Sequence, residues 1–281
     1  MIRYLTIIFV FAFFINNQSV GQKNNKAELQ WKTERTLQIP ESVKYYAKEN
    51  ILFVSSIDGK PDVKDNDGFI SKIGLDGKII KLNWVEGISA PKGMAVYKDK
   101  LYVSNIDQLI EIDIASATIT KRYNASGAKF LNDVAVDKQG NIYVSGMSKN
   151  KIWQLKDGLF TIWLASDSLK YPNGLFVEKN RLLIGNRGFI LSVDLKSKKI
   201  KKIIENTGSI DGLVPYGHGT YLISDWAQNV YLVHPKKERV LVLNTGSENI
   251  NAADIEYIPK KRLLLVPTFF DNNVRAYKIK N

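Results

Sequence analysis

Six residues that could share one site recur at the same place in a repeated phrase of this chain. Each phrase starts with one of them, continues as a short apolar strand, turns, and usually ends as a second apolar strand closing with Ser or Gly. The leading residues are Glu41, Lys92, Asn132, Asn173, Asp211 and Ala253. Two carboxylates and two amides form a set of hard oxygen donors, which suits Ca²⁺, and also Mg²⁺ or Mn²⁺. A divalent ion held in this way polarises a carbonyl group while a neighbouring carboxylate takes a proton from water.

The spacing of the phrases predicts the elements that position these residues. Taken singly, Asn or Asp before Gly is an ordinary turn residue, but recurrence at one register favours a shared site. The leading residues are separated by 51, 40, 41, 38 and 42 positions. A repeat of this length built from short strands is typical of a β-propeller with one blade per repeat. Six copies predict six blades, whose inner-strand mouths converge on the axis.

Each blade is expected to contain four antiparallel strands. In the third repeat these are Val134–Val136, Ile142–Ser145, Lys151–Leu155 and Leu159–Leu164, from the axis outwards. Turns rich in Gly and Asn separate them, because these residues tolerate positive φ.

The sixth repeat contains only three predicted strands: Ile255–Ile258, Arg262–Val266 and Val274–Ile279. The segment Glu28–Gln38 precedes the first repeat and has no blade of its own. We therefore expect an all-β, six-bladed β-propeller in which this N-terminal strand completes the last blade and removes an open edge.

The first 21 residues are expected to be a secretory signal peptide. Arg3 provides a positive start, residues 4–15 form an apolar run too short to span a bilayer, and Ser19-Val20-Gly21 resembles a cleavage site. An uncleaved N-terminal anchor is the alternative. Residues 22–281 would then form a single domain, periplasmic or secreted, without membrane contact after cleavage. The chain has no cysteine, which excludes a lipoprotein anchor, disulfides and thiolate metal sites.

The formal net charge of +12 raises the question of nucleic-acid binding. The lysines, however, fall mainly in outer strands and turns, as in the segment 196–202, where lysine discourages association between sheet edges. We therefore expect a small-molecule substrate and no nucleic acid. The sequence does not indicate an oligomeric state.

Four of the phrases resemble, in order and spacing, those of the senescence marker protein/gluconolactonase (regucalcin-like) family, and more distantly those of paraoxonases. They are Pro40-Glu41-Ser42-Val43, Leu131-Asn132-Asp133, Pro172-Asn173-Gly174 and Ile210-Asp211-Gly212, and the resemblance extends from about residue 38 to 279. It implies a six-bladed propeller with a divalent cation in its axial pocket and hydrolysis of lactones or related esters.

The resemblance also implies roles for single residues. Glu41, Asn173 and Asp211 would be the principal metal ligands, and Asn132 would touch the metal or a substrate oxygen. Asp211 would in addition act as general base or hold an activated water. Ca²⁺ is the expected ion, with Mg²⁺, Mn²⁺ and Zn²⁺ as alternatives.

Lys92 departs from the pattern, because paraoxonase-like members carry a histidine in the equivalent phrase. Its ammonium could anchor a substrate carboxylate, stabilise an oxyanion, or act as a base if its pKa is lowered. It could also replace the metal by neutralising Glu41 and Asp211. The two histidines, His218 and His234, have no Ser or Asp partner that would suggest nucleophilic catalysis.

Residues that follow the second strands are expected to form the pocket walls. They are Asn105, Met147, Asn186, Arg187, Asp225, Trp226, Phe269 and Asp271. Arg187 and Trp226 would suit a carboxylated or ring-shaped ligand. The leading hypothesis is an exported, metal-dependent hydrolase of a small lactone or ester. The alternative is a non-catalytic propeller, resembling NHL-type modules, that binds a peptide, glycan or small ligand.

Overall fold

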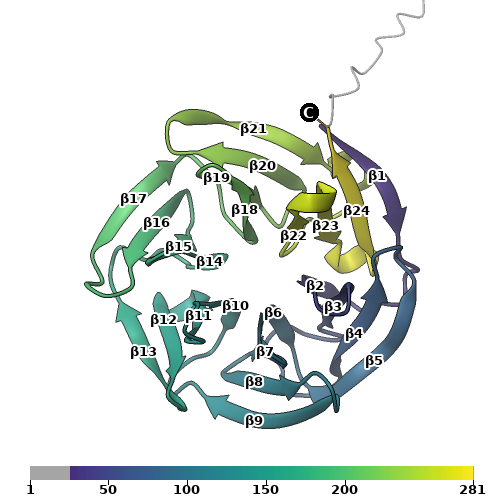
Figure 1. Cartoon of the computed structure of the whole chain (residues 1–281), viewed down its shortest axis with the longest axis horizontal. Coiled ribbons are helices and arrows are strands. Elements are labelled where there is room, and N and C mark those ends of the chain that lie inside the picture. Colours follow the sequence, from purple (N-terminus) through teal and green to yellow (C-terminus); the bar gives the residue numbers. More distant parts are fainter. Residues whose placement is uncertain (1–25, 281) are drawn as a thin grey trace, which may run out of the picture.

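Six four-stranded antiparallel sheets stand around a central axis in the computed structural model, which describes residues 26–280 (Figure 1). From the axis outwards, the first blade contains β2 (Pro40–Tyr46), β3 (Ile51–Ser56), β4 (Gly68–Gly74) and β5 (Ile79–Ile88). The second contains β6 (Pro91–Tyr97), β7 (Lys100–Asn105), β8 (Gln108–Asp113) and β9 (Thr118–Asn124). The third contains β10 (Leu131–Val136), β11 (Ile142–Gly146), β12 (Lys151–Lys156) and β13 (Leu159–Ala165). The next two are β14 (Leu175–Glu178), β15 (Arg181–Gly185), β16 (Phe189–Asp194) and β17 (Ile200–Glu205); and β18 (Leu213–Gly217), β19 (Thr220–Ser224), β20 (Asn229–His234) and β21 (Lys237–Asn244). The sixth is β22 (Glu256–Ile258), β23 (Leu263–Pro267), β24 (Val274–Ile279) and β1 (Ala27–Lys32). The predicted six-bladed propeller is confirmed.

Four short 3₁₀ helices occur in connections between strands of the described chain. They are η1 (Met147–Lys149), η2 (Gly246–Glu248), η3 (Pro259–Lys261) and η4 (Phe269–Asp271). Of these, η2 connects the fifth blade to the sixth, and η4 connects β23 to β24 within the sixth blade and lies against β2 of the first.

The inner strands are buried on both faces because each blade packs against its neighbours. Every residue of β3 is buried, whereas β9 at the rim is mostly exposed. The core therefore lies between blades: Phe53 and Ile70 of the first blade share a cluster with Leu101 and Val103 of the second.

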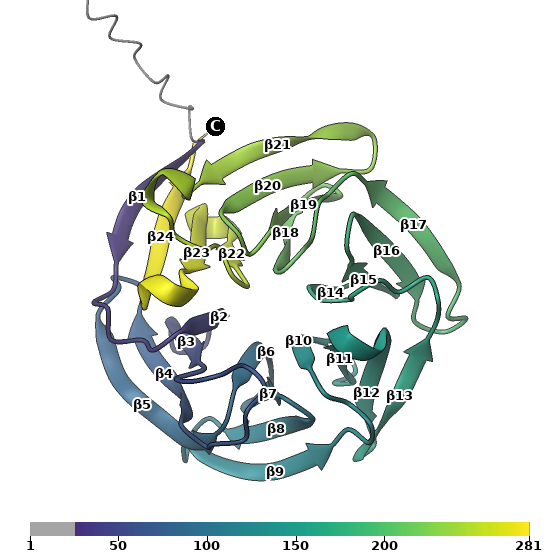
Figure 2. The same ribbon diagram turned by 180° about the vertical axis from the view of Figure 1, so that it is seen from behind.

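The ring closes where β1 pairs antiparallel with β24, so that both ends of the described chain belong to one sheet (Figure 2). Ala27 lies opposite Ile279 and Lys32 opposite Arg275. The predicted closing strand was too long, because residues 33–38 leave the sheet. They remain attached through backbone hydrogen bonds from Thr33 to Val274 and from Leu37 to Asn272.

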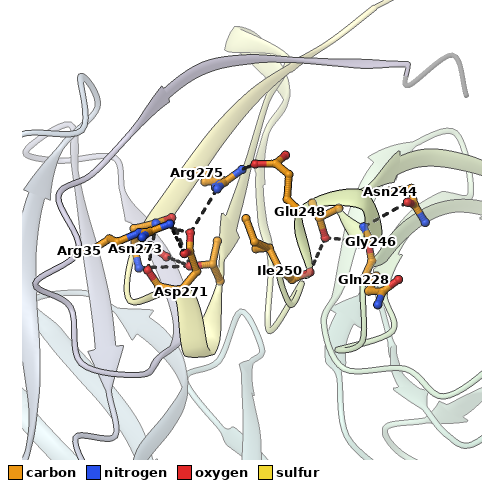
Figure 3. A network of polar contacts seen from close by, with 11 residues as sticks. Arg35, Gln228, Asn244, Gly246, Glu248, Ile250, Asp271, Asn273 and Arg275 are labelled. Carbon is orange, nitrogen blue, oxygen red and sulfur yellow. Dashed lines mark hydrogen bonds and ion pairs between the residues drawn. The ribbon is translucent and has the colours of Figure 1, made fainter. Parts of the chain in front are cut away.

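A polar network reinforces the closure (Figure 3). Arg275 of β24 is 3% exposed, and its guanidinium pairs with Glu248 of η2 at 2.8 Å and with Asp271 of η4 at 3.2 Å. Arg35, in the segment after β1, pairs with the other oxygen of Asp271 at 2.6 Å. The expectation that Asp271 forms a pocket wall is wrong, because its carboxylate is held by these two arginines.

The predicted signal peptide lies outside the described residues. Within residues 26–280, no helix has the length and apolar character needed to cross a membrane.

Deleting residues 27–38 tests the closure. This segment includes Leu37, which is fully buried, and the half-buried Trp31, which packs against the same core cluster. Loss of their burial should cost at least about 4 kcal/mol, which corresponds to a fall in Tm of about 10 °C or more. Leu29→Ser, on the same strand but 46% exposed, is the control and should change the free energy of unfolding by only about 0.5 kcal/mol. Equal melting temperatures for the deletion and the wild type would contradict this topology.

Candidate functional site

The N-terminal mouths of the inner strands open into a cavity of about 540 Å³ on the axis. Five of the six leading residues line it: Glu41, Lys92, Asn132, Asn173 and Asp211. The sixth, Ala253, is fully buried and packs in a small apolar cluster. Residues that lie far apart in the sequence are thus brought together by the radial arrangement of the blades, as the repeat predicted.

Two carboxylates of the cavity are buried, and each has a buried oxygen without a hydrogen-bond partner among the described residues. Glu41 and Asp211 are 4% and 6% exposed. Asn173 donates a hydrogen bond from Nδ2 to Asp211 Oδ1 at 2.6 Å. Glu41 Oε2 and Asp211 Oδ2 have no hydrogen-bond partner among residues 26–280. A buried carboxylate oxygen without a partner is costly, so both atoms are candidates to bind a ligand.

Burial, with a smaller contribution from the nearby Asp254, raises the pKa of Asp211 to about 8. Burial likewise raises the pKa of Glu41 well above its usual range, with additional contributions from Asp211 and Asp254. Strongly raised pKa values in a cavity are typical of sites that bind ligands or move protons.

Lys92 is 1% exposed, and its ammonium is held by two backbone carbonyl groups. Nζ donates hydrogen bonds to the carbonyl oxygens of Pro61 at 2.8 Å and Ala90 at 3.1 Å, and lies 4.5 Å from the centre of the Phe130 ring. In the described chain it forms no ion pair within 4.0 Å of Glu41 or Asp211. Burial lowers its pKa to about 8, against the opposing attraction of Glu41.

Two further carboxyl groups belong to residues that directly follow a leading residue, namely Asp133 after Asn132 and Asp254 after Ala253. Asp254 accepts a hydrogen bond from Ser42 Oγ at 2.6 Å, and Asp133 accepts hydrogen bonds from the backbone N–H groups of Val134 and Leu175. Burial raises the pKa of Asp133 to about 7, although these backbone hydrogen bonds lower it.

We did not predict these two carboxyl groups from the sequence, although the sequence contained a signal for them. Gly93, Gly174 and Gly212 occupy the position that Asp133 and Asp254 occupy in other phrases. A Cβ on Gly93 would lie 2.5 Å from Asp133, so the glycine makes room for the acid of the next blade.

The walls agree only partly with expectation. Met147, Arg187, Asp225, Trp226 and Phe269 line the cavity, together with Phe130 and Tyr171, which were not predicted. Phe130 and Tyr171 each precede a leading residue by two positions, and that spacing could have identified them.

The expectation that Asn105 and Asn186 are wall residues is wrong. Both side chains are buried and hold loop backbone in place: Asn105 Oδ1 accepts from Ala90 N at 2.8 Å, and Asn186 Oδ1 accepts from Lys170 N at 2.9 Å. His218 and His234 do not line the cavity. His218 is exposed in the turn between β18 and β19, at the opposite end of the inner strand from Asp211.

The leading residues contribute two carboxylates, two amides and one ammonium to the cavity, while the third carboxylate of its wall, Asp225, accepts hydrogen bonds from Gln228 and Asn229. Within residues 26–280 there is no cluster of three or more His, Cys, Asp or Glu side chains that could hold a metal ion. Any cation in this cavity would therefore depend on the amide oxygens of Asn132 and Asn173 in addition to Glu41 and Asp211. Such a mixture of carboxylate and carbonyl oxygens is what hard divalent cations bind.

Comparison with known proteins supports the fold. A β-propeller repeat family matches residues 119–152. A gluconolactonase from Xanthomonas campestris superimposes with a TM-score of 0.68 at 16% identity, covering 87% of each chain. A catalytically inactive variant of virginiamycin B lyase from Staphylococcus aureus, solved with quinupristin, gives a TM-score of 0.62 at 11% identity, covering 90% of this chain and 99% of the lyase. A search of curated proteins finds no match. At these identities the likeness shows a shared β-propeller fold.

The raised pKa of Asp211 predicts how stability depends on pH in chelator-treated protein. Between its ordinary pKa of 3.8 and its folded pKa of about 8, Asp211 keeps its proton only in the folded state. The unfolded state then binds fewer protons, so the free energy of unfolding should fall as pH rises from about 5 to about 8, by up to about 1.4 kcal/mol per pH unit for this group. Chemical denaturation at several pH values measures the slope.

Asp211→Asn should make that slope shallower, because the amide keeps the hydrogen bond from Asn173 but does not titrate. Glu205→Gln, which changes an exposed carboxylate on β17, serves as the control and should leave the slope unchanged. An identical slope in Asp211→Asn and wild type would contradict the assignment.

Proposed function

We propose that this protein is an exported hydrolase of a small lactone or ester that works with a divalent cation, Ca²⁺ in the first place, on the propeller axis. The observation that carries the proposal is the pair of buried carboxylate oxygens without partners, Glu41 Oε2 and Asp211 Oδ2, in the wall of one cavity. The distant likeness to a gluconolactonase is consistent with it, but fold alone is a weak argument for function.

The residues present fit a hard cation. Glu41 and Asp211 would each provide a free carboxylate oxygen. Asn173 donates its amide N–H to Asp211, so its carbonyl oxygen remains for a ligand. The Asn132 side chain has no hydrogen-bond partner among the described residues, and it would bind the cation or a substrate oxygen. When bound, the cation would polarise the substrate carbonyl and stabilise negative charge on its oxygen.

Asp211 is the residue that we propose as general base. Asp211 lines the cavity and its buried Oδ2 atom has no partner among the described residues, and the ionised carboxylate can take a proton from water as the water attacks the carbonyl carbon. The hydrogen bond from Asn173 fixes the orientation of the carboxylate. Placing the base on a rigid inner-strand mouth reduces the reorganisation that the reaction requires.

We propose that the ammonium of Lys92, held in a fixed position, stabilises negative charge on a substrate oxygen. Two of its three N–H donors are held by the carbonyls of Pro61 and Ala90, which leaves one donor for a substrate oxygen. A buried ammonium fixed in this way stabilises an oxyanion without reorganising during the reaction.

Calcium binding is the first test of the proposal. Addition of Ca²⁺ to chelator-treated wild type should raise Tm, since a ligand that binds only the folded state stabilises it, by about 2.7 kcal/mol at a hundredfold excess over Kd. Glu41→Gln and Asp211→Asn should abolish the rise and the hydrolysis of small lactones and phenyl acetate, while Glu205→Gln retains both.

If Ca²⁺, Mg²⁺, Mn²⁺ and Zn²⁺ all leave Tm unchanged and no ester is cleaved, the hydrolase proposal fails. The non-catalytic propeller that binds a peptide, glycan or small ligand then becomes the better description.

Lys92→Met separates the roles of the ammonium. We expect kcat for ester cleavage to fall about 100-fold, the size of effect seen when one oxyanion donor is removed. The affinity for Ca²⁺ should stay the same or increase, because a positive charge near the cation is lost. Circular dichroism and Tm control for folding, since the substitution leaves the carbonyls of Pro61 and Ala90 without their donor. An unchanged kcat would exclude Lys92 from the reaction, and a gain in Ca²⁺ affinity alone would identify it as a competitor of the cation.

A further inference from the structure

Three aromatic residues of the cavity wall have a backbone conformation that bulky side chains rarely adopt. Tyr171, Trp226 and Phe269 have φ values of +51°, +60° and +52°, and all three line the cavity. Left-handed backbone costs free energy for residues with a Cβ, and a bulky residue there is an outlier. Glycine or asparagine would fit these positions with less strain, so the turns themselves do not require aromatic rings.

The surrounding structure holds these strained residues in place. Tyr171 N donates to Asn150 Oδ1 at 3.0 Å, and the carbonyl oxygen of Trp226 accepts from Ala252 N at 3.1 Å. The carbonyl oxygen of Phe269 accepts from Asn272 N at 3.1 Å. Strain that is fixed by its surroundings is concentrated at ligand-binding sites.

The rings remain accessible to a ligand. Trp226 is 41% exposed and Tyr171 is 50% exposed, although both are large and apolar over most of their surface. Trp226 meets Phe269 edge to face with ring centres 5.5 Å apart, and this contact fixes the orientation of the indole. The cavity therefore has an aromatic wall formed by the fifth and sixth blades.

Arg187, on the fourth blade, is an exposed residue that also lines the cavity, and its charge has no partner among the described residues. Its guanidinium carbon is 4.3 Å from the centre of the Tyr171 ring, and within residues 26–280 its side chain has no hydrogen bond or ion pair. Stacking uses the face of the guanidinium and leaves the N–H groups in its plane free for a carboxylate.

A second arginine of the chain provides a matched comparison. Arg239 stacks on Tyr231 with a similar separation of 4.5 Å, but its Nη1 donates to the carbonyl oxygen of Thr207 at 2.9 Å. It lies away from the cavity. The same stacked arrangement is thus satisfied by the protein at Arg239 and left open at Arg187.

We propose that the cavity selects anionic substrates that carry a ring, with the ring against Trp226 and Phe269 and a carboxylate bound by Arg187. The reaction on such a substrate rests on the proposed function, whereas the binding does not. Charge also sets the orientation, because the guanidinium of Arg187 has no partner among the described residues, whereas two of the three donors of Lys92 are already held by Pro61 and Ala90. The anionic end is therefore held at Arg187, which leaves the uncharged ester or lactone carbonyl to face Asp211 and Lys92.

Benzoate and benzamide test the proposal, since they have nearly the same shape and differ in charge. Binding is followed by tryptophan fluorescence and Tm at pH 7 in the presence of chelator, so that no metal contributes. We expect benzoate to bind at least 10-fold more tightly than benzamide. Arg187→Met should reduce benzoate binding to the level of benzamide, Arg187→Lys should restore part of it, and Arg239→Met should have no effect. Equal binding of the two compounds to wild type, binding of neither, or an unchanged preference in Arg187→Met would each overturn the proposal.

Hydrolysis of acetylsalicylate and phenyl acetate by the calcium-loaded protein separates this inference from the proposed function. A preference for acetylsalicylate that Arg187→Met abolishes supports both. Selective benzoate binding without cleavage of either ester means that the hydrolase proposal fails while the anionic site stands. Cleavage of both esters with no dependence on Arg187 means that the anionic site fails while the hydrolase proposal stands.

Discussion

The pairing of β1 with β24 is the constraint on which the rest of this structure depends. Without β1 the sixth blade would have three strands and an open edge. With it, the first and last described strands form one sheet, and Arg35 in the segment after β1 pairs with Asp271, which also pairs with Arg275 of β24. A closed ring fixes where six inner strands meet, so the side chains at their mouths share one space on the axis.

The convergence of the strand mouths brings four acidic residues close together, where their negative charges would repel one another. Glu41, Asp133 and Asp211 are buried near the axis and Asp254 is half-buried beside them, and burial together with the neighbouring carboxylates raises the pKa of each. Ser42 donates a hydrogen bond to Asp254, and backbone N–H groups donate to Asp133. Glu41 and Asp211 each keep one oxygen without a partner, because the ammonium of Lys92 is directed at two carbonyls instead. A cation on the axis would give both of these oxygens a partner. The closed ring that brings the two carboxylates together thus provides the site that the proposed hydrolysis needs.

The sequence predicted the blades and the members of the cavity because both depend on a local pattern that repeats. Glu41, Asn132, Asn173 and Asp211 could be placed together from their register alone. The partners of Lys92 could not, since Pro61 comes from a loop about thirty residues away whose path no repeat specifies. Asn105 and Asn186 occupied plausible wall positions, but their amides bind loop backbone. The aromatic wall was only partly predicted: Trp226 and Phe269 were expected because they follow second strands, whereas Tyr171 precedes a leading residue, where no wall residue was sought.

Anomalous diffraction from crystals soaked in Mn²⁺ is the decisive experiment for a cation on the propeller axis, because it locates the ion without relying on activity. We expect one strong peak on the axis, within coordination distance of Glu41 and Asp211 and absent from crystals of Asp211→Asn. A peak elsewhere on the protein, or an axis without density at saturating Mn²⁺, would contradict this expectation.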